Sequence, residues 1–172
     1  MANALQFATR CALQTLLGAT TFDCTMNLRS WLKYWLPVVG WMIFIFTGST
    51  DLLAAEHTSR FIGPFLHWLD PNVSDATVAS VQLVVRKCAH LTEYAILAAL
   101  LFRAFRQRQP RVGRVLAVSF VLAAVYAALD EFHQSFVASR TGSPLDVLID
   151  CAGALAGLLI YWRVIRDRQS KI

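Results

Sequence analysis

The apolar positions of this chain fall into four stretches, and charged residues bound each of them. The uncharged stretches are residues 34–50, 94–102, 115–129 and 151–162. A helix that crosses a bilayer needs about 20 apolar residues, so the last three stretches must continue through neighbouring charges. The pattern therefore predicts four membrane-spanning helices, over about residues 33–50, 83–102, 114–134 and 144–163.

The predicted fold class is all-α, an integral membrane bundle of four transmembrane helices. Five arginines between residues 103 and 114 stand without one acidic residue, and the C-terminal tail is also basic. Because cytoplasmic loops carry an excess of Lys and Arg, we expect this loop and both termini to be cytoplasmic. The connection 51–80 then faces outwards, and its segment FIGPFLHWL has the aromatic residues of an interfacial helix.

Composition agrees with this class. Of 172 residues, 56% are hydrophobic and only 16% are charged, against about 25% charged in a typical soluble domain. The net charge of +5 comes from arginines at the ends of apolar stretches, which indicates topology rather than nucleic-acid binding. We expect a single membrane domain over residues 28–166 and a tail over 167–172. Residues 1–27 are interpreted as an extension, either a wrong start site or a weak interfacial helix.

Ionisable residues of different predicted helices fall at a similar depth. Counting about 1.5 Å per helical residue from the cytoplasmic arginines places His90, Asp130 and Asp146 about 20–25 Å into the membrane. A charge near a helix centre opposes insertion by about 2.5–3.5 kcal/mol, so we expect these groups to face one another inside the bundle. Gly153 and Gly157 share a helix face with Asp146 and predict close helix packing.

Several motifs follow one another in a recognisable order. They are Ser49 in FTGSTD, Lys87-x-x-His90-x-x-x-Tyr94, Asp130-Glu131-x-His133-Gln134, Ser139-Arg140, and Asp146 before a glycine-rich helix. Over about residues 28–162 this arrangement resembles the VanZ-like family. The resemblance implies a small multi-helix bacterial protein of the inner membrane. The family name comes from a member linked to teicoplanin resistance, a role that the resemblance alone does not transfer.

These motifs supply the predicted site. The residues expected to act as acid–base or ligand groups are His90, Asp130, Glu131, His133 and Asp146. The expected anion holders are Lys87 and Arg140, and the supporting donors are Tyr94, Gln134 and Ser49. Carboxylates and imidazoles suit general acid–base chemistry, and Lys and Arg suit phosphate or carboxylate ligands. We therefore expect binding or modification of a lipid-linked, anionic envelope component near the outer membrane face.

Three alternatives stay open at this stage. The polar groups could form a structural network that locks the helices of an accessory protein together. They could line a small transporter or permeation pathway, although four helices are few for this unless the protein forms an oligomer. They could also hold Zn²⁺ or Mn²⁺ through oxygen and nitrogen ligands. The residues do not decide whether a reaction is catalysed, and they assign no cofactor.

Overall fold

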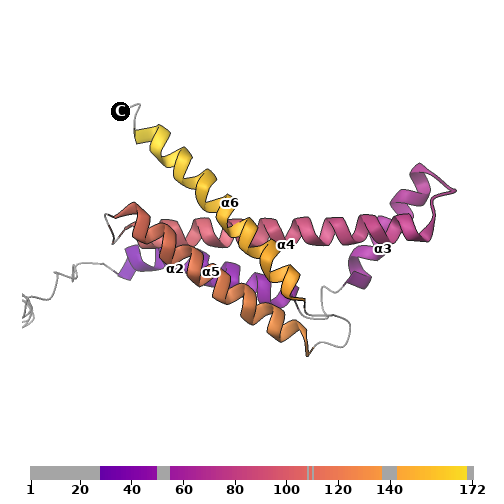
Figure 1. Cartoon of the computed structure of the whole chain (residues 1–172), viewed down its shortest axis with the longest axis horizontal. Helices are drawn as coiled ribbons and strands as arrows, with labels where there is room; N and C mark the ends of the chain where they lie inside the picture. Colours follow the sequence, from indigo (N-terminus) through magenta and orange to yellow (C-terminus); the bar gives the residue numbers. More distant parts are fainter. Residues whose placement is uncertain (1–27, 50–54, 108, 110, 137–142, 170–172) are drawn as a thin grey trace, which may run out of the picture. The chain divides into compact units, whose positions relative to one another are not determined.

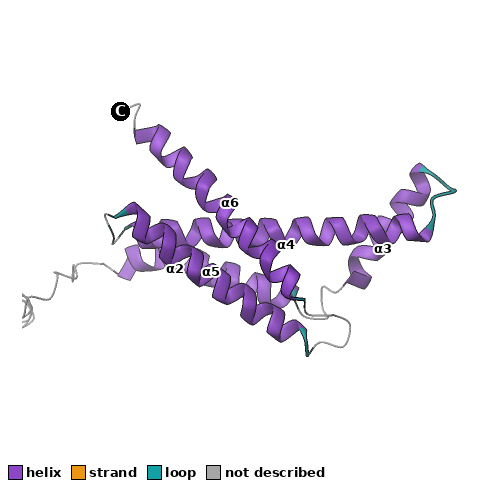
Figure 2. Ribbon diagram, in the orientation of Figure 1, coloured by secondary structure: helices purple, strands orange, loops and turns teal. Residues whose placement is uncertain are grey.

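The computed structural model describes five helices and no strand within the residues that it places. The described residues are 28–49, 55–107, 109, 111–136 and 143–169. The helices are α2 (Leu28–Gly48), α3 (Ala55–Leu69), α4 (Asp75–Arg106), α5 (Val112–Gln134) and α6 (Pro144–Gln169) (Figure 2). The chain divides into two compact units, Met1–Lys33 and Tyr34–Ile172, and every contact described below lies within the second. The all-α prediction is confirmed.

Three of the described helices, α4, α5 and α6, are long and apolar enough to cross a membrane. The helix α2 covers the first predicted span but is not among them. The fourth span therefore stays a prediction.

Helix α4 is longer than its predicted span. It begins at Asp75 rather than near residue 83, because the side chain of Ser74 caps it by accepting a hydrogen bond from the Thr77 amide at 3.2 Å. Its 32 residues reach about 48 Å at 1.5 Å per residue, whereas a hydrocarbon core is about 30 Å thick.

Helix α6 crosses α4 at very close range (Figure 1). A Cβ atom added at Gly153 would lie 2.2 Å from the carbonyl oxygen of Leu91, and one added at Gly157 would lie 2.2 Å from that of Ala95. Real Cβ atoms do not come so close to a backbone oxygen, so the two helices can touch only because both positions lack a side chain. The close packing predicted from these glycines is confirmed.

Helix α2 is attached to α4 and α5 by hydrogen bonds to backbone carbonyls. The indole N–H of Trp41 donates to the carbonyl oxygen of Glu93 at 2.9 Å. The hydroxyl of Tyr126 donates to the carbonyl oxygen of Met42 at 2.6 Å. A buried tryptophan or tyrosine usually finds such a partner for its polar atom. These two bonds fix the height of α2 against its neighbours.

Polarity is distributed as in a membrane protein, with polar groups inside and large apolar side chains outside. The buried polar residues are Ser49, His90, Ser119, Asp130, Glu131, Gln134 and Asp150. The exposed apolar residues lie on every described helix and include Ile43, Val84, Val121, Leu148 and Ile160. In lipid, polar groups must be satisfied inside the protein, so this arrangement suits a hydrocarbon environment.

Helix α3 lies against the first turns of α4. Gly63 faces the buried side chain of Val78. Three aromatic side chains of α3, Phe61, Phe65 and Trp68, are exposed instead. Their spacing of four and three residues places them on one face of the helix.

Candidate functional site

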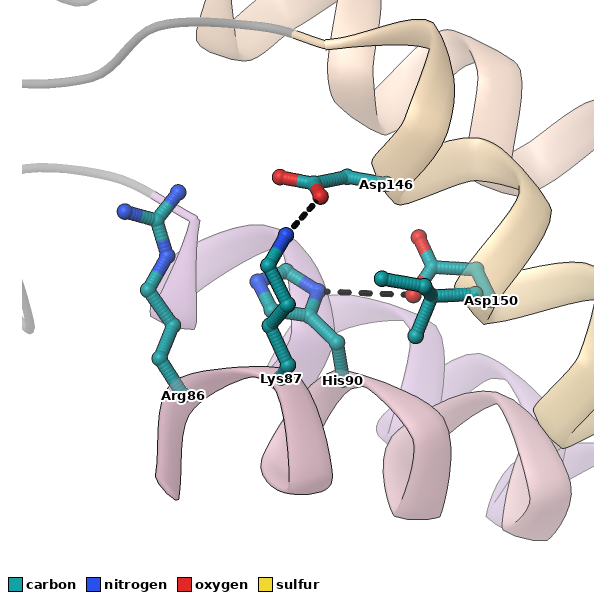
Figure 3. Close-up of a pocket in the computed structure, with 6 residues that line it drawn as sticks. Arg86, Lys87, His90, Asp146 and Asp150 are labelled. Carbon is teal, nitrogen blue, oxygen red and sulfur yellow. Dashed lines mark hydrogen bonds and ion pairs between the residues drawn. The ribbon is translucent and has the colours of Figure 1, made fainter. Parts of the chain in front are cut away.

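Two pairs of charged or ionisable side chains link α4 to α6. Lys87 Nζ donates a hydrogen bond to Asp146 Oδ1. One turn further along both helices, His90 Nδ1 lies 3.7 Å from Asp150 Oδ1 (Figure 3). The pairs stack because a spacing of three residues on α4 faces a spacing of four on α6. The sequence placed all four residues on suitable helix faces, and the crossing of the helices brings them together.

These side chains line a hollow between the two helices. Its lining residues are Arg86, Lys87, His90, Asp146, Ile149 and Asp150. Arg86 stands at one side of the hollow, next to Lys87 (Figure 3). Within the described part of the chain Arg86 forms no ion pair, whereas Lys87 is paired with Asp146. The hollow therefore combines an imidazole and two carboxyl groups with a guanidinium group that has no direct ion-pair partner among the described residues and interacts with the Glu131 carboxyl group only at longer range.

Asp150 is the most deeply buried acid of the site. Its exposed fraction is 0%, and neither carboxyl oxygen has a hydrogen-bond partner among the described residues. The separation of 3.7 Å from His90 is too long for a hydrogen bond. The carboxyl groups of Glu131, Asp130 and Asp146 are close enough to that of Asp150 for Coulombic interaction. Acidic side chains of α5 and α6 therefore lie within Coulombic range of the buried Asp150 carboxyl group.

A second cluster joins the end of α2 to the end of α5. Asp130 Oδ2 accepts hydrogen bonds from Ser49 Oγ at 2.8 Å and from Gln134 Nε2 at 3.0 Å. The Gln134 amide also lies 3.3 Å from Ser49 Oγ. All three side chains are buried. We name these three residues the serine–aspartate cluster. Its internal hydrogen bonds connect the C-terminal end of α2 to the C-terminal end of α5.

Glu131 fastens the end of α5 to the start of α6. Its Oε2 accepts a hydrogen bond from the backbone N–H of Ser143 at 2.9 Å. Ser143 in turn lies next to Pro144, the first residue of α6, and its hydroxyl accepts from the Leu145 amide at 3.3 Å. An acidic group near a helix N-terminus is favoured by the helix dipole. This contact gives Glu131 a structural role in addition to the predicted acid–base role.

Two of the predicted residues point to other neighbours. The ring of His133 packs on that of Phe46 of α2, with 4.7 Å between the ring centroids, and His133 does not line the hollow. Tyr94 is fully buried, its ring 6.4 Å from that of Tyr126. The Tyr94 hydroxyl has no hydrogen-bond partner among the residues described. Arg140 lies outside the described residues.

Two lining residues, Arg86 and Asp150, are not among the predicted site residues. The helical period puts Asp150 on the same face as Asp146, and the sequence offered it only as a possible metal ligand. Arg86 is adjacent to the predicted anion holder Lys87. In the described segments no three His, Cys, Asp or Glu residues are placed to hold a metal ion. The roles proposed for the individual residues stay predictions.

Comparison with known proteins supplies the family. The sequence profile of the VanZ/LLP1 family matches residues 34–166, which include every described residue of the hollow and of the serine–aspartate cluster. The search among curated proteins gave no match, and neither did the search among solved structures. The resemblance seen in the motifs is confirmed, and the apolar helices α4, α5 and α6 agree with it. The chain is a membrane protein of the VanZ/LLP1 family.

Proposed function

We propose that the hollow between α4 and α6 binds the anionic headgroup of a lipid-linked component of the cell envelope. The observation that carries this proposal is Arg86, which lines the hollow and has no ion-pair partner among the described residues. Lys87 beside it is already neutralised by Asp146. A guanidinium group binds phosphate or carboxylate through two parallel hydrogen bonds. An anionic ligand would give Arg86 a direct partner, which the longer-range interaction with the Glu131 carboxyl group does not supply.

The surroundings of the hollow suit a ligand that also has an apolar chain. Leu83 and Val84 precede the lining residues of α4 by one turn, and both are exposed. On α6, Leu145 and Leu148 are exposed beside the lining residue Ile149. A headgroup in the hollow would therefore continue into lipid along two apolar helix surfaces. A soluble anion would gain nothing from these surfaces.

Acid–base chemistry on the bound headgroup is the second part of the proposal. His90 is buried at the hollow and can exchange a proton with a ligand held by Arg86. Histidine is the side chain most often used for such transfers. The two lining acids lie beside basic side chains of α4: Asp146 is paired with Lys87, and Asp150 lies 3.7 Å from His90.

The proposed topology has four spans, including α2, with both termini in the cytoplasm. The hollow then lies towards the outer face, because it is far along α4 from the basic turn that begins at Arg103. The length of α4 supports an interfacial position for α3, since the first turns of α4 exceed the hydrocarbon core. Phe61, Phe65 and Trp68 would enter the headgroup boundary. Reporter fusions at Asn72 and Gln107 test this topology: only the Gln107 fusion should report a cytoplasmic position.

Native mass spectrometry of the purified protein tests the binding proposal, with a polyprenyl phosphate as the probe. Loss of a charge-assisted hydrogen bond costs about 1.5–3 kcal/mol, so Arg86→Gln should weaken retention of the probe by at least about tenfold. Arg114→Gln is the matched control, because Arg114 is an exposed arginine near the opposite end of α5 from Asp130. Equal retention by both variants and the wild type would contradict the proposal.

The second candidate function is a structural role for the buried polar residues. The serine–aspartate cluster favours this role at the ends of α2 and α5. Asp130 has two hydrogen-bond donors from two elements and is buried. For a purely structural network, Asp130→Asn should lower abundance and probe retention together. For a binding site at the hollow, Arg86→Gln should lower retention while abundance is unchanged.

A further inference from the structure

We propose that the hollow selects a headgroup with a single negative charge, so that among lipid phosphates it binds a phosphodiester in preference to a phosphate monoester. The inference rests on the proposed function of the hollow and adds to it the chemical class of the ligand. The observation behind it is the balance of charge in the lining. Unless His90 and Asp150 are both protonated, the lining side chains carry at most one net positive charge.

The first support is the difference between the two cations of the hollow (Figure 3). Lys87 Nζ donates a hydrogen bond to Asp146 Oδ1, so a carboxylate already faces its charge. Arg86 is half-buried and has no direct ion-pair partner among the described residues. Its guanidinium group can hold two oxygens of one phosphate. A phosphodiester offers two such oxygens and one charge, whereas an ionised monoester has three oxygens and up to two charges.

The second support is the pair formed by His90 and Asp150. His90 Nδ1 lies 3.7 Å from Asp150 Oδ1. The pair is neutral when the two groups hold one titrating proton between them, whichever of them carries it, and it is negative when they hold none. A positive pair requires a proton on both groups at once. The limit on positive charge in the hollow is therefore the same whether the acid or the imidazole is the protonated group.

The third support is the charge of the groups that surround the hollow. Glu131 of α5 interacts with Arg86 at longer range. Asp130 of α5 and Glu93 of α4 are within Coulombic range of Asp150. Each of these three surrounding acids is either neutral or negative, so none of them adds a positive charge. Where they are ionised, they oppose a second negative charge on the ligand.

The removal of charge from water decides between the two kinds of ligand. The cost of burying an ion grows with the square of its charge, so a dianion costs about four times as much as a monoanion of the same size. Two side chains of the hollow are buried, since Asp150 is 0% and His90 9% exposed. A unit charge about 10 Å away, at an effective dielectric constant of about 20, changes a binding constant by roughly tenfold. We therefore expect the phosphodiester to bind at least about tenfold more tightly than the dianionic monoester.

The test is native mass spectrometry of the full-length protein with two probes that share one polyprenyl chain: polyprenyl phosphate and its methyl diester. The second pKa of a phosphate monoester is about 6, so the monoester carries two charges at about pH 8 and one at about pH 5, whereas the diester carries one at both. The wild type should retain the diester at least about tenfold more strongly at the higher pH, and the difference should disappear at the lower pH. Titration of the protein acts on both probes, so the ratio of their retention isolates the charge of the ligand.

Asp146→Asn changes the selectivity in a predictable direction. It leaves the charge of Lys87 without its carboxylate, so the variant should retain the monoester about tenfold more strongly, relative to the diester, than the wild type does at about pH 8. The variant should fold, because the Lys87 side chain is 36% exposed and can stay in contact with water. Asp70→Asn is the matched control: it makes the same change of charge at an exposed acid between α3 and α4, and should leave the ratio unchanged.

The outcomes separate this inference from the proposed function. Equal retention of the two probes by the wild type at about pH 8, or stronger retention of the monoester, would overturn the inference. The proposed function would survive that result if Arg86→Gln weakened retention of both probes. An unchanged ratio in Asp146→Asn would also overturn the inference, and the comparison in the wild type needs no variant at all. If the wild type retained neither probe, the proposed function would fail and the inference with it.

Discussion

Gly153→Ala tests whether the contact between α4 and α6 positions the site. The added Cβ would lie 2.2 Å from the carbonyl oxygen of Leu91, whereas an ordinary contact begins at 3.4 Å. The helices must therefore move apart by about 1.2 Å, the difference between these two distances. Overpacking of this kind costs about 1–3 kcal/mol. The obstacle is backbone, which cannot rotate away as a side chain would.

The assay is the apparent melting temperature of purified protein in detergent, followed by loss of the monodisperse peak in size-exclusion chromatography. At about 2–4 °C per kcal/mol for a chain of this size, the variant should melt about 2–12 °C below the wild type. The same displacement should lengthen the 3.7 Å separation of His90 Nδ1 and Asp150 Oδ1.

Gly40→Ala is the matched control, because no atom lies within 4 Å of the Cβ position at Gly40 in α2. Alanine favours a helix over glycine by about 1 kcal/mol, so this variant should be as stable as the wild type or more stable. If Gly153→Ala melts at the same temperature as Gly40→Ala, the reasoning about close approach is wrong.

Two further predictions concern the polar contacts. Lys87→Met should lower the free energy of unfolding by about 1–3 kcal/mol, between the values for exposed and buried ion pairs. The double variant with Asp146→Leu should recover most of this loss in the same melting assay, and failure to recover would contradict the pairing. Ser49→Ala should cost about 1.5–3 kcal/mol, because it removes a buried donor from Asp130. The exposed control Ser80→Ala should change stability by less than about 0.5 kcal/mol, and equal effects would refute the role of Ser49.

The membrane class and the identity of the helices could be derived from the sequence. Apolar stretches bounded by arginines require helices in lipid, because only a helix satisfies its own backbone there. The sequence did not show that α4 begins before its predicted span, because the rule of apolar length does not see a capping serine, and Ser74 starts the helix in a polar segment. The two glycines could be recognised as a packing face since the helical period alone puts them together.

Which polar side chains become neighbours in the folded bundle could not be derived from the sequence in the same way. Depth counting placed His90, Asp130 and Asp146 at one level but said nothing of which helices would be neighbours. The crossing of α4 and α6 pairs His90 with Asp150. The position of α2 instead brings Ser49 within hydrogen-bond distance of Asp130.

The sequence by itself determined that costly polar side chains had to be enclosed by helices, since lipid offers them no partner. Only the tertiary structure decided which side chain each one meets, because a helical period fixes the face of a residue and not the neighbour of that face. Arg86 shows the difference: its charge is evident from the sequence, but its place in the hollow beside a paired lysine depends on how α6 lies on α4.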